Sequence, residues 1–230
     1  MDELPIRPNV QAAPQDGLNA AGLASDRPMD WRLGLPTLQG TLLTLREPHR
    51  DDAMSMLAAL ACRDVSRFIS PPPPSVEGFA KFIAWTQRQR RAGRLITFAV
   101  VPRAFETAVG VLQLRSLAPD FGIAEGGFAL GADYWGSGMF ADGARLAIDF
   151  ALQVVGTRRL EARAVLQNGR GNGALRKLGA VQEGVLRRSF VRDGKHFDQA
   201  LWALLADEWP AKARLGFRIV HQLDLTRRAS

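Results

Sequence analysis

The stretch "ADYWGSGMFADGARLAIDFAL", residues 132–152, carries glycines at a spacing that could bind a phosphate group. Gly136, Gly138 and Ala141 fall within six positions, and a helical pattern of apolar residues follows them. Glycine keeps the backbone N–H groups at a helix start accessible, and these groups form a concave anion site that the helix dipole strengthens. The stretch therefore predicts a bound phosphate. The alternative is a glycine turn that holds the helix against a sheet with nothing bound.

The same residues match the fingerprint of dinucleotide-binding domains, Gly136-x-Gly138-x-x-Ala141. Glu161 follows about twenty residues later, at the distance of a ribose-binding acid. The order of the predicted elements disfavours NAD as the ligand. A dinucleotide-binding domain places the fingerprint after its first strand and continues with further strand–helix units. Here about 90 residues of predicted helices and a hairpin precede the motif, and a second hairpin ends the domain.

Composition disfavours several other kinds of site. The chain has 230 residues, 47% of them hydrophobic, which is enough for one domain with a sizeable core. Its one cysteine, Cys62, allows no internal disulfide, and His49, His196 and His221 are too dispersed for a metal site, so we expect no metal. The N-terminus lacks the apolar segment of a secretory signal, and no run reaches the length of a membrane span. We therefore expect a cytoplasmic protein without a membrane partner.

The charge balance favours an anionic ligand. The net charge is +7, and the basic residues are spread along the chain instead of forming a basic run or alternating with aromatic residues. Such a surface steers anions toward it without the usual signature of an RNA-binding protein. A nucleic-acid or ribosome-associated protein is therefore an alternative that the sequence disfavours.

The elements around the glycine stretch predict one α/β domain, a mixed sheet of about six or seven strands flanked by helices. Residues 1–36 read as a flexible or loosely docked arm, residues 37–206 as the domain and residues 207–230 as a C-terminal extension in which 216–225 could form a strand. The predicted strands are 40–48, 94–101, 108–116, 125–131, 158–166 and a hairpin over 182–206 that turns at Asp193-Gly194. The predicted helices are 49–61, 75–91, about 138–153 and 168–180.

Five segments stand in an order that is typical of one family. They are "GTLLTLREPHRDDA", "TFAVV…AVGVLQL", "YWGSGMFADGARLAIDFAL", "LEARAVLQNGRGNGALRKLGAVQEG" and "RRSFVRDGKHFDQALWALL". Together they resemble the GNAT N-acetyltransferases, and among these the ribosomal-protein alanine acetyltransferases of the RimJ/RimL type. The resemblance covers roughly residues 36–206, and Asn168 stands eleven residues before Gly179, similar to the family's Asn…KLGF spacing.

The resemblance implies that the phosphate belongs to acetyl-CoA. The pantetheine arm is expected between two splayed parallel strands, 125–131 and 158–166. Gly126-Gly127 suits a bulge or a close backbone approach there, or else a kinked edge strand. The residues expected to bind the coenzyme share backbone amides or side-chain amides near its path: Phe128, Ala129, Leu130, Gly136, Ser137, Gly138, Met139, Phe140, Asn168 and Asn172.

Acetyl transfer also needs a neutral amine, donors for the oxyanion and a proton for the leaving thiolate. Glu125, at the start of the strand expected to bear the thioester, is the predicted general base, and Glu161 and Asp198 are the alternatives. The acceptor is predicted to be a protein N-terminal amine or a small-molecule amine. The loop 62–75, the helix after it and the hairpin 187–196 would select the acceptor. The chain is expected to be a monomer or a homodimer.

Three positions depart from the family. The chain's one tyrosine, Tyr134, is in the wrong segment to protonate the thiolate, and Gly171 stands where the alanine acetyltransferase type often has a serine. Asp133 stands where many relatives carry a side-chain anchor for phosphate. These departures keep a second reading open, a CoA-binding module without catalytic activity.

Overall fold

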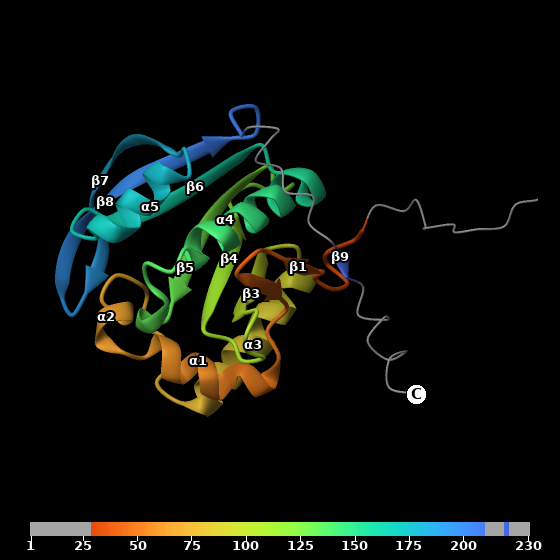
Figure 1. The fold of residues 1–230 in the computed structure, drawn as a ribbon. Helices are drawn as coiled ribbons and strands as arrows, with labels where there is room; N and C mark the ends of the chain where they lie inside the picture. The colour runs from red at the N-terminus through yellow and green to blue at the C-terminus, as the bar shows by residue number, and fades with distance from the viewer. Residues whose placement is uncertain (1–28, 210–218, 221–230) are drawn as a thin grey trace, which may run out of the picture.

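The computed structural model describes residues 29–209 and 219–220, and its centre is one mixed sheet (Figure 1). Nine described strands form it in the order β7-β8-β6-β5-β4-β3-β2-β1-β9. They are β1 (Thr37–Gln39), β2 (Leu43–Arg46), β3 (Leu95–Pro102), β4 (Gly110–Ser116), β5 (Ile123–Leu130), β6 (Arg159–Val165), β7 (Val181–Arg192), β8 (Lys195–Leu205) and β9 (Ile219–Val220). Within this described sheet β5 and β6 are parallel, and the other neighbours are antiparallel. The predicted class, a mixed α/β sheet with flanking helices, is confirmed.

The described sheet has more strands than the six or seven predicted. The segment predicted as one strand over 40–48 belongs to a hairpin, because β1 and β2 pair antiparallel around the turn that starts at Gly40. β9, inside the predicted segment 216–225, pairs with β1 at the sheet edge. Strands of two to four residues leave too little alternation in the sequence to reveal them.

Helices cover both faces of the sheet (Figure 1). α4 and α5 lie over one face, and α1 and α3 lie over the other. The described helices are η1 (Arg50–Asp52), α1 (Ala53–Leu60), α2 (Arg63–Ser66), α3 (Val76–Arg91), η2 (Ala132–Tyr134), α4 (Met139–Phe150), its π-helical continuation η3 (Ala151–Val155) and α5 (Gly169–Lys177). α3 starts where the sequence predicted, because the hydroxyl oxygen of Ser75 accepts a hydrogen bond from the N–H of Gly78 at 3.1 Å.

Each face of the sheet has its own apolar core. On the α4 face, Phe98 of β3 packs edge to face against Phe150 of α4, with ring centroids 5.3 Å apart. On the α3 face, Met56 and Phe79 pack against small and branched residues of β3 and β4. β3 is buried along its whole length because helices cover both of its sides. This packing fixes α4 over the sheet, with its N-terminus just beyond the end of β5.

Two tryptophans outside the predicted domain bounds of 37–206 are buried. Trp31 is 4% exposed and packs edge to face against Phe121 at 5.2 Å between centroids. Trp209 is also 4% exposed, and its Nε1 donates to a carboxylate oxygen of Asp149 at 2.7 Å. One tryptophan from each predicted extension is thus buried against the domain. Residues 1–28, 210–218 and 221–230 of those extensions lie outside the described residues.

A buried ion pair joins β2 to the start of α1. Arg46 donates from both terminal nitrogens to the two carboxylate oxygens of Asp52, each at 2.7 Å, and the N–H of His49 donates to Asp52 at 2.7 Å. Burial by itself raises the pKa of Asp52, but the hydrogen bonds from Arg46 and His49 outweigh it, so the pKa lies below its ordinary value. The carboxylate form of Asp52 therefore stabilises the folded state.

Replacing Asp52 with asparagine should lower the free energy of unfolding by about 2–3 kcal/mol at neutral pH, because it removes charge-assisted hydrogen bonds to Arg46. Because the pKa of Asp52 is lower in the folded state than in the unfolded state, its carboxylate stabilises the fold fully at any pH above the unfolded-state pKa. This stabilisation is lost as the pH falls through the folded-state pKa. Urea unfolding should therefore show the difference between the two proteins narrowing below about pH 4. Glu77→Gln, which removes an exposed pair with Lys81, is the control and should change stability little. An equal loss in both variants would contradict the assignment.

Candidate active site

β5 and β6 separate half way along their length. They pair from Ile123↔Arg159 to Gly126↔Ala162, after which β6 stays paired with β8 and β5 with β4. Residues 127–130 of β5 therefore present a backbone edge that pairs with no described strand on the β6 side. An extended ligand can bind such an edge through main-chain hydrogen bonds. Phe128, Ala129 and Leu130 lie on it, as the sequence predicted for the splayed strands.

The bulge predicted as one option at Gly126-Gly127 is wrong. β4 and β5 pair without a register shift from Gly110↔Leu130 to Ser116↔Ala124. Neither of the two glycines has a positive φ, and a Cβ on Gly127 would meet nothing within 4 Å. The opening in the sheet comes from the divergence of β6, and oxyanion donors would have to come from the open edge of β5 instead of a bulge.

The glycine loop leads into α4 through two left-handed residues. Gly136 and Gly138 have φ of +77° and +88°, a conformation that costs an L-amino acid about 1–2 kcal/mol. Gly138 is the N-cap of α4 and supplies no side-chain cap. Ser137 stabilises the loop internally, since its hydroxyl donates to the C=O of Tyr134 at 2.6 Å. The same hydroxyl oxygen accepts from the N–H of Met139 at 3.3 Å, so this donor of the first turn is already used. The N–H groups of Phe140 and Ala141 in the same turn are left for an external anion.

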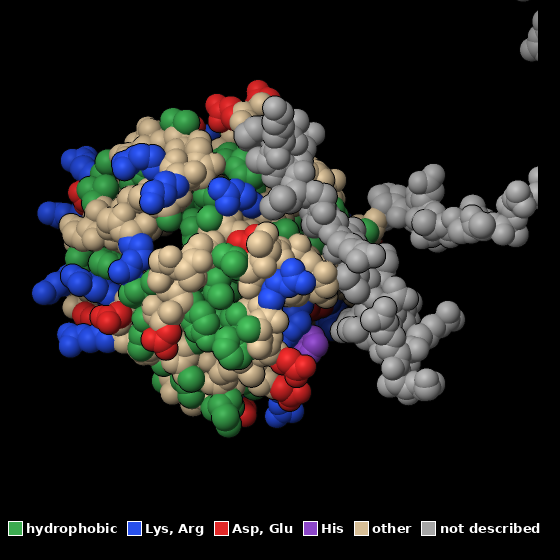
Figure 2. Space-filling model, in the orientation of Figure 1, with side chains coloured by type: hydrophobic (Ala, Val, Ile, Leu, Met, Phe, Trp, Pro, Cys, Tyr) green, Lys and Arg blue, Asp and Glu red, His purple; other side chains and the backbone are tan. Residues whose placement is uncertain are grey.

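A groove of about 1020 Å³ runs from this loop along the open edge of β5 to α5. Basic side chains from three segments line it: Arg67 after α2, Arg145 of α4, and Arg170 and Lys177 of α5. Figure 2 shows Lys and Arg side chains around a hollow on this side of the molecule. The groove thus combines helix-terminal N–H groups with cationic side chains, which suits a ligand that carries several phosphates.

Asn168 is placed at the junction of the groove and the sheet. It is the N-cap of α5, and its side-chain oxygen accepts from the N–H of Gly171 at 2.9 Å. Both residues line the groove. A Cβ on Gly171 would lie 2.6 Å from the amide nitrogen of Asn168, so a serine at this position would require Asn168 to move. The glycine at 171 is therefore matched to this cap.

Asn172 has a structural role. Its amide nitrogen donates to the carbonyls of Val165 and Asn168, each at 2.9 Å, and its oxygen accepts from Nε1 of Trp202 at 2.9 Å. These bonds join α5 to β6 and β8. Asn172 thus orients the helix that carries Asn168, and we assign it to positioning rather than to the coenzyme.

Glu125 lies on the α3 face, beside the last paired residues of β5 and β6. Its side chain is 18% exposed and forms ion pairs with Arg115 of β4 and with Nε of Arg163 on β6, the latter at 3.6 Å. Both carboxylate oxygens are thus engaged by guanidinium groups. A water molecule that is to reach Glu125 must share these oxygens with the arginines.

The two alternative carboxylates are also paired. Glu161, the register partner of Glu125, accepts from Nε of Arg159 at 2.9 Å, and Glu183 accepts from the same guanidinium at 2.9 Å. The hydrogen bond from Arg159 lowers the pKa of Glu183, and the two carboxylates raise the pKa of Arg159. Asp198 instead accepts from the N–H of Arg188 at 2.8 Å, within an irregular part of the β7–β8 pair. The structure thus brings Glu125 and Glu161 together at the splay and leaves Asp198 on the hairpin.

The sequence did not reveal the basic residues of the groove, nor the contact between α5 and the glycine loop on its two sides. The guanidinium of Arg170 lies 3.9 Å from the ring centroid of Trp135, so α5 contacts the glycine loop through a cation–π interaction. Arg145, Arg170 and Lys177 supply the side-chain charge that Asp133 does not. Arg145 could have been identified from the sequence, because it lies on the helix that follows the glycine loop. Arg170 and Lys177 could not, because only the tertiary fold brings α5 to the groove.

Within residues 29–209 and 219–220, no helix has both the length and the apolar character of a membrane span. The same described residues contain no group of three or more His, Cys, Asp or Glu side chains arranged for a metal ion.

Comparison with known proteins agrees with the sequence resemblance. The acetyltransferase (GNAT) domain family matches residues 43–181. The uncharacterized N-acetyltransferase p20 of Bacillus licheniformis is 23% identical over 176 residues, which cover 76% of this chain and 99% of that protein.

Two solved structures share the fold. Mycobacterium smegmatis RimJ in complex with CoA-disulfide has a TM-score of 0.71 at 20% identity, covering 80% of this chain and 93% of that one. The ribosomal-protein-S5-alanine acetyltransferase from Vibrio fischeri has a TM-score of 0.68 at 18% identity, covering 76% and 98%. The neighbours of this fold thus include proteins of the RimJ/RimL type.

Proposed function

The chain belongs to the acetyltransferase (GNAT) domain family, and from that membership we propose that it transfers an acetyl group from acetyl-CoA to a primary amine. The acceptor is a protein N-terminal amine or a small-molecule amine, and the cytoplasm is the proposed compartment. The observation that supports this proposal best is the open edge of β5, which leads directly from a helix N-terminus with two left-handed glycines to paired carboxylates at the splay.

The residues present fit the coenzyme. Backbone N–H groups of residues 136–140 and the side chains of Arg145, Arg170 and Lys177 would hold its phosphates. The backbone of residues 128–130 would pair with the amides of its arm, and Asn168 would approach the sulfur. When bound, the coenzyme supplies a thioester carbon that an amine can attack.

The chain's own groups then handle protons. An α-amine with a pKa near 8 is mostly protonated at pH 7, and we propose that Glu125 accepts the proton it loses, through water. The amine nitrogen forms a bond to the acyl carbon, the carbon–sulfur bond breaks, and the thiolate takes up a proton to leave as free CoA. Because the chain has Gly171 where a hydroxyl would otherwise lie near the sulfur, water is the proposed proton donor to the thiolate.

Calorimetry tests the proposed ligand. Acetyl-CoA should bind with a measurable heat and NAD should not, and Gly136→Ala should weaken acetyl-CoA binding about tenfold by distorting the loop. Gly156→Ala is the matched control: Gly156 also has a positive φ, +85°, with open space around its Cβ position, but it ends η3 far from the groove. Gly156→Ala should lower the free energy of unfolding about as much as Gly136→Ala does, without weakening acetyl-CoA binding. Equal affinity in wild type and Gly136→Ala would reject the loop as the phosphate site.

A second candidate function is a CoA-binding module without transferase activity. It is favoured by the engagement of both oxygens of Glu125 by Arg115 and Arg163, together with Gly171 near the expected sulfur. An assay of free CoA release against a panel of peptide and small-molecule amines distinguishes the two. Binding without release for any amine would support the module.

A further inference from the structure

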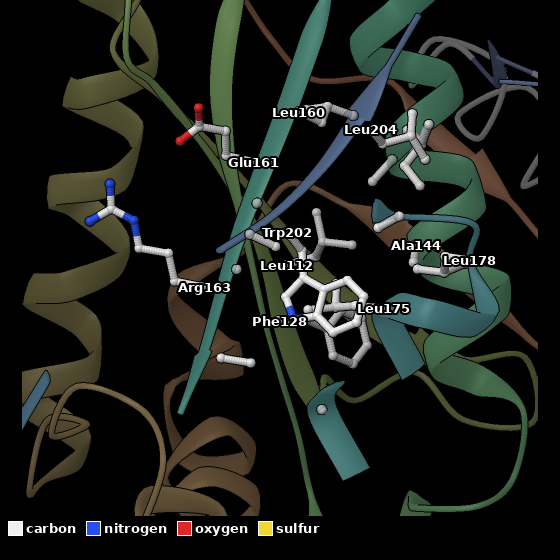
Figure 3. A pocket seen from close by; sticks show the side chains of 18 of the residues that line it. Leu112, Phe128, Ala144, Leu160, Glu161, Arg163, Leu175, Leu178, Trp202 and Leu204 are labelled. Atoms are coloured by element: carbon white, nitrogen blue, oxygen red, sulfur yellow. The ribbon is translucent and has the colours of Figure 1, made fainter. Parts of the chain in front are cut away.

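An apolar cavity of about 250 Å³ lies beside the groove that leads from the glycine loop to α5. The groove and the cavity share Phe128, Asn168 and Gly171 among their lining residues, so the two spaces adjoin at these residues. From this junction the cavity extends between α4, α5 and the β6–β8 pair, where apolar side chains line it (Figure 3): Leu112, Leu160, Leu175, Leu178, Trp202 and Leu204.

Small residues create this space. Gly126 and Ala162 are the last register partners before β5 and β6 separate, and Ala144 of α4 lines the cavity opposite them. A Cβ on Gly126 would approach no atom closer than the carbonyl oxygen of Glu161 at 3.7 Å. The cavity is partly open instead of sealed within the core, so a ligand can enter it, and its small lining residues leave room for one.

The position of the cavity identifies that occupant. This step rests on the proposed function: with the arm of the coenzyme along the open edge of β5, its thioester lies at the shared residues Phe128, Asn168 and Gly171. The next apolar space in line is the cavity, which is where an acyl chain longer than acetyl would extend. A cavity of about 150 Å³ is enough for a benzene ring, so 250 Å³ exceeds what an acetyl methyl group fills.

We infer that this chain prefers straight, apolar acyl groups of about four to six carbons, from butyryl to hexanoyl, over acetyl. The balance of the reaction is unchanged: the amine nitrogen bonds to the acyl carbon, the carbon–sulfur bond breaks, the ammonium loses one proton and the thiolate gains one. The longer chain adds burial of methylene groups in the cavity and requires no further reactant.

The lining also predicts discrimination against charged acyl groups. Glu161 and Arg163 line the rim, but their side chains point to the other side of β6, toward α3, whereas the labelled apolar side chains point toward α4 (Figure 3). Arg163 is the one cationic residue among the described lining residues, and it is paired with Glu125 on that other side. A carboxylate at the end of a succinyl chain would therefore enter the apolar part of the cavity without a cationic partner there. Succinyl has the same carbon number as butyryl, which makes the two a matched pair of probes.

Calorimetry with CoA, acetyl-CoA, butyryl-CoA, hexanoyl-CoA and succinyl-CoA tests the inference on the wild-type chain. Each buried methylene should tighten binding roughly fourfold, so butyryl-CoA should bind about tenfold or more tightly than acetyl-CoA, and succinyl-CoA should not share this gain. Butyryl-CoA that binds no better than acetyl-CoA overturns the inference but leaves the proposed function standing. Absence of binding by every ligand, CoA included, overturns both.

Ala144→Leu should fill part of the cavity. It should remove the advantage of hexanoyl-CoA over acetyl-CoA and leave the affinity for CoA itself within a factor of about two. Ala58→Leu, the same change on the exposed surface of α1, is the control and should keep the wild-type chain-length preference. A preference that persists in Ala144→Leu places the acyl chain elsewhere and contradicts the inference. Should Ala144→Leu fail to fold, the wild-type ligand series decides alone.

Discussion

Replacing Glu125 with glutamine should lower the rate of acyl transfer about 100-fold at pH 7 and leave acetyl-CoA affinity unchanged. Glutamine keeps the size of the side chain but cannot accept a proton from the amine. The loss should shrink as the pH rises from 7 to 9, because an increasing share of an α-amine with a pKa near 8 is already neutral. Steady-state kinetics at saturating acceptor over this pH range, with calorimetry for the coenzyme, measures both quantities.

Glu161→Gln is the matched control for Glu125, because Glu161 is its register partner on β6 and is also bound by an arginine. Glu161→Gln should change the rate of acyl transfer only a few-fold, because Glu161 is not the proposed acceptor of the amine proton. If Glu161→Gln instead causes the 100-fold loss, the base is Glu161. A loss in Glu125→Gln that is the same at pH 7 and pH 9 would indicate that the change acts through the ion pairs with Arg115 and Arg163.

Replacing Asp142 with alanine should lower the free energy of unfolding by about 4 kcal/mol and weaken coenzyme binding. Asp142 lies in the first turn of α4, is 8% exposed, and accepts hydrogen bonds from the N–H groups of Thr41, Leu42 and Leu43 at 2.7–3.3 Å. Alanine leaves these donors in the β1–β2 turn without their acceptor. The start of α4 also loses its attachment to the sheet, and the glycine loop precedes it directly. Urea unfolding and calorimetry measure the two effects.

Two further variants test whether Asp142 acts through its contact with the β1–β2 turn or merely through its negative charge near the glycine loop. In Gly40→Ala the new Cβ would lie 2.4 Å from a carboxylate oxygen of Asp142, so it should displace the carboxylate and destabilise without removing it. Because both changes disturb one contact, the double variant should be less destabilised than the two losses added together. Asp133→Ala removes an exposed carboxylate near the same loop and should leave stability nearly unchanged. Additive losses, or a stable Asp142→Ala, would refute the anchoring role.

Local patterns were sufficient to predict most elements of the fold. The cap at Ser75 and the turn at Asp193-Gly194 follow from short-range backbone preferences, and the structure has both: Asp193 and Gly194 have φ of +50° and +71°, as a type I′ turn requires. The glycine loop was predictable for the same reason, because Gly136 and Gly138 stand where the backbone adopts a left-handed conformation. The short strand pairs β1–β2 and β1–β9 could not be predicted, because strands of two to four residues are too short to show a period.

The sequence by itself therefore determined most of the order of strands and helices, the glycine loop and the family, because each depends on the types and spacing of neighbouring residues. The tertiary structure alone decided that Asp142 holds the β1–β2 turn, that Arg170 of α5 reaches Trp135, and that the carboxylate of Glu125 is shared by two arginines. It also decided that Gly126, Ala162 and Ala144 leave an apolar cavity beside the splay. These contacts join residues from distant segments, and which side chains meet depends on strand register and helix packing, which no local pattern specifies.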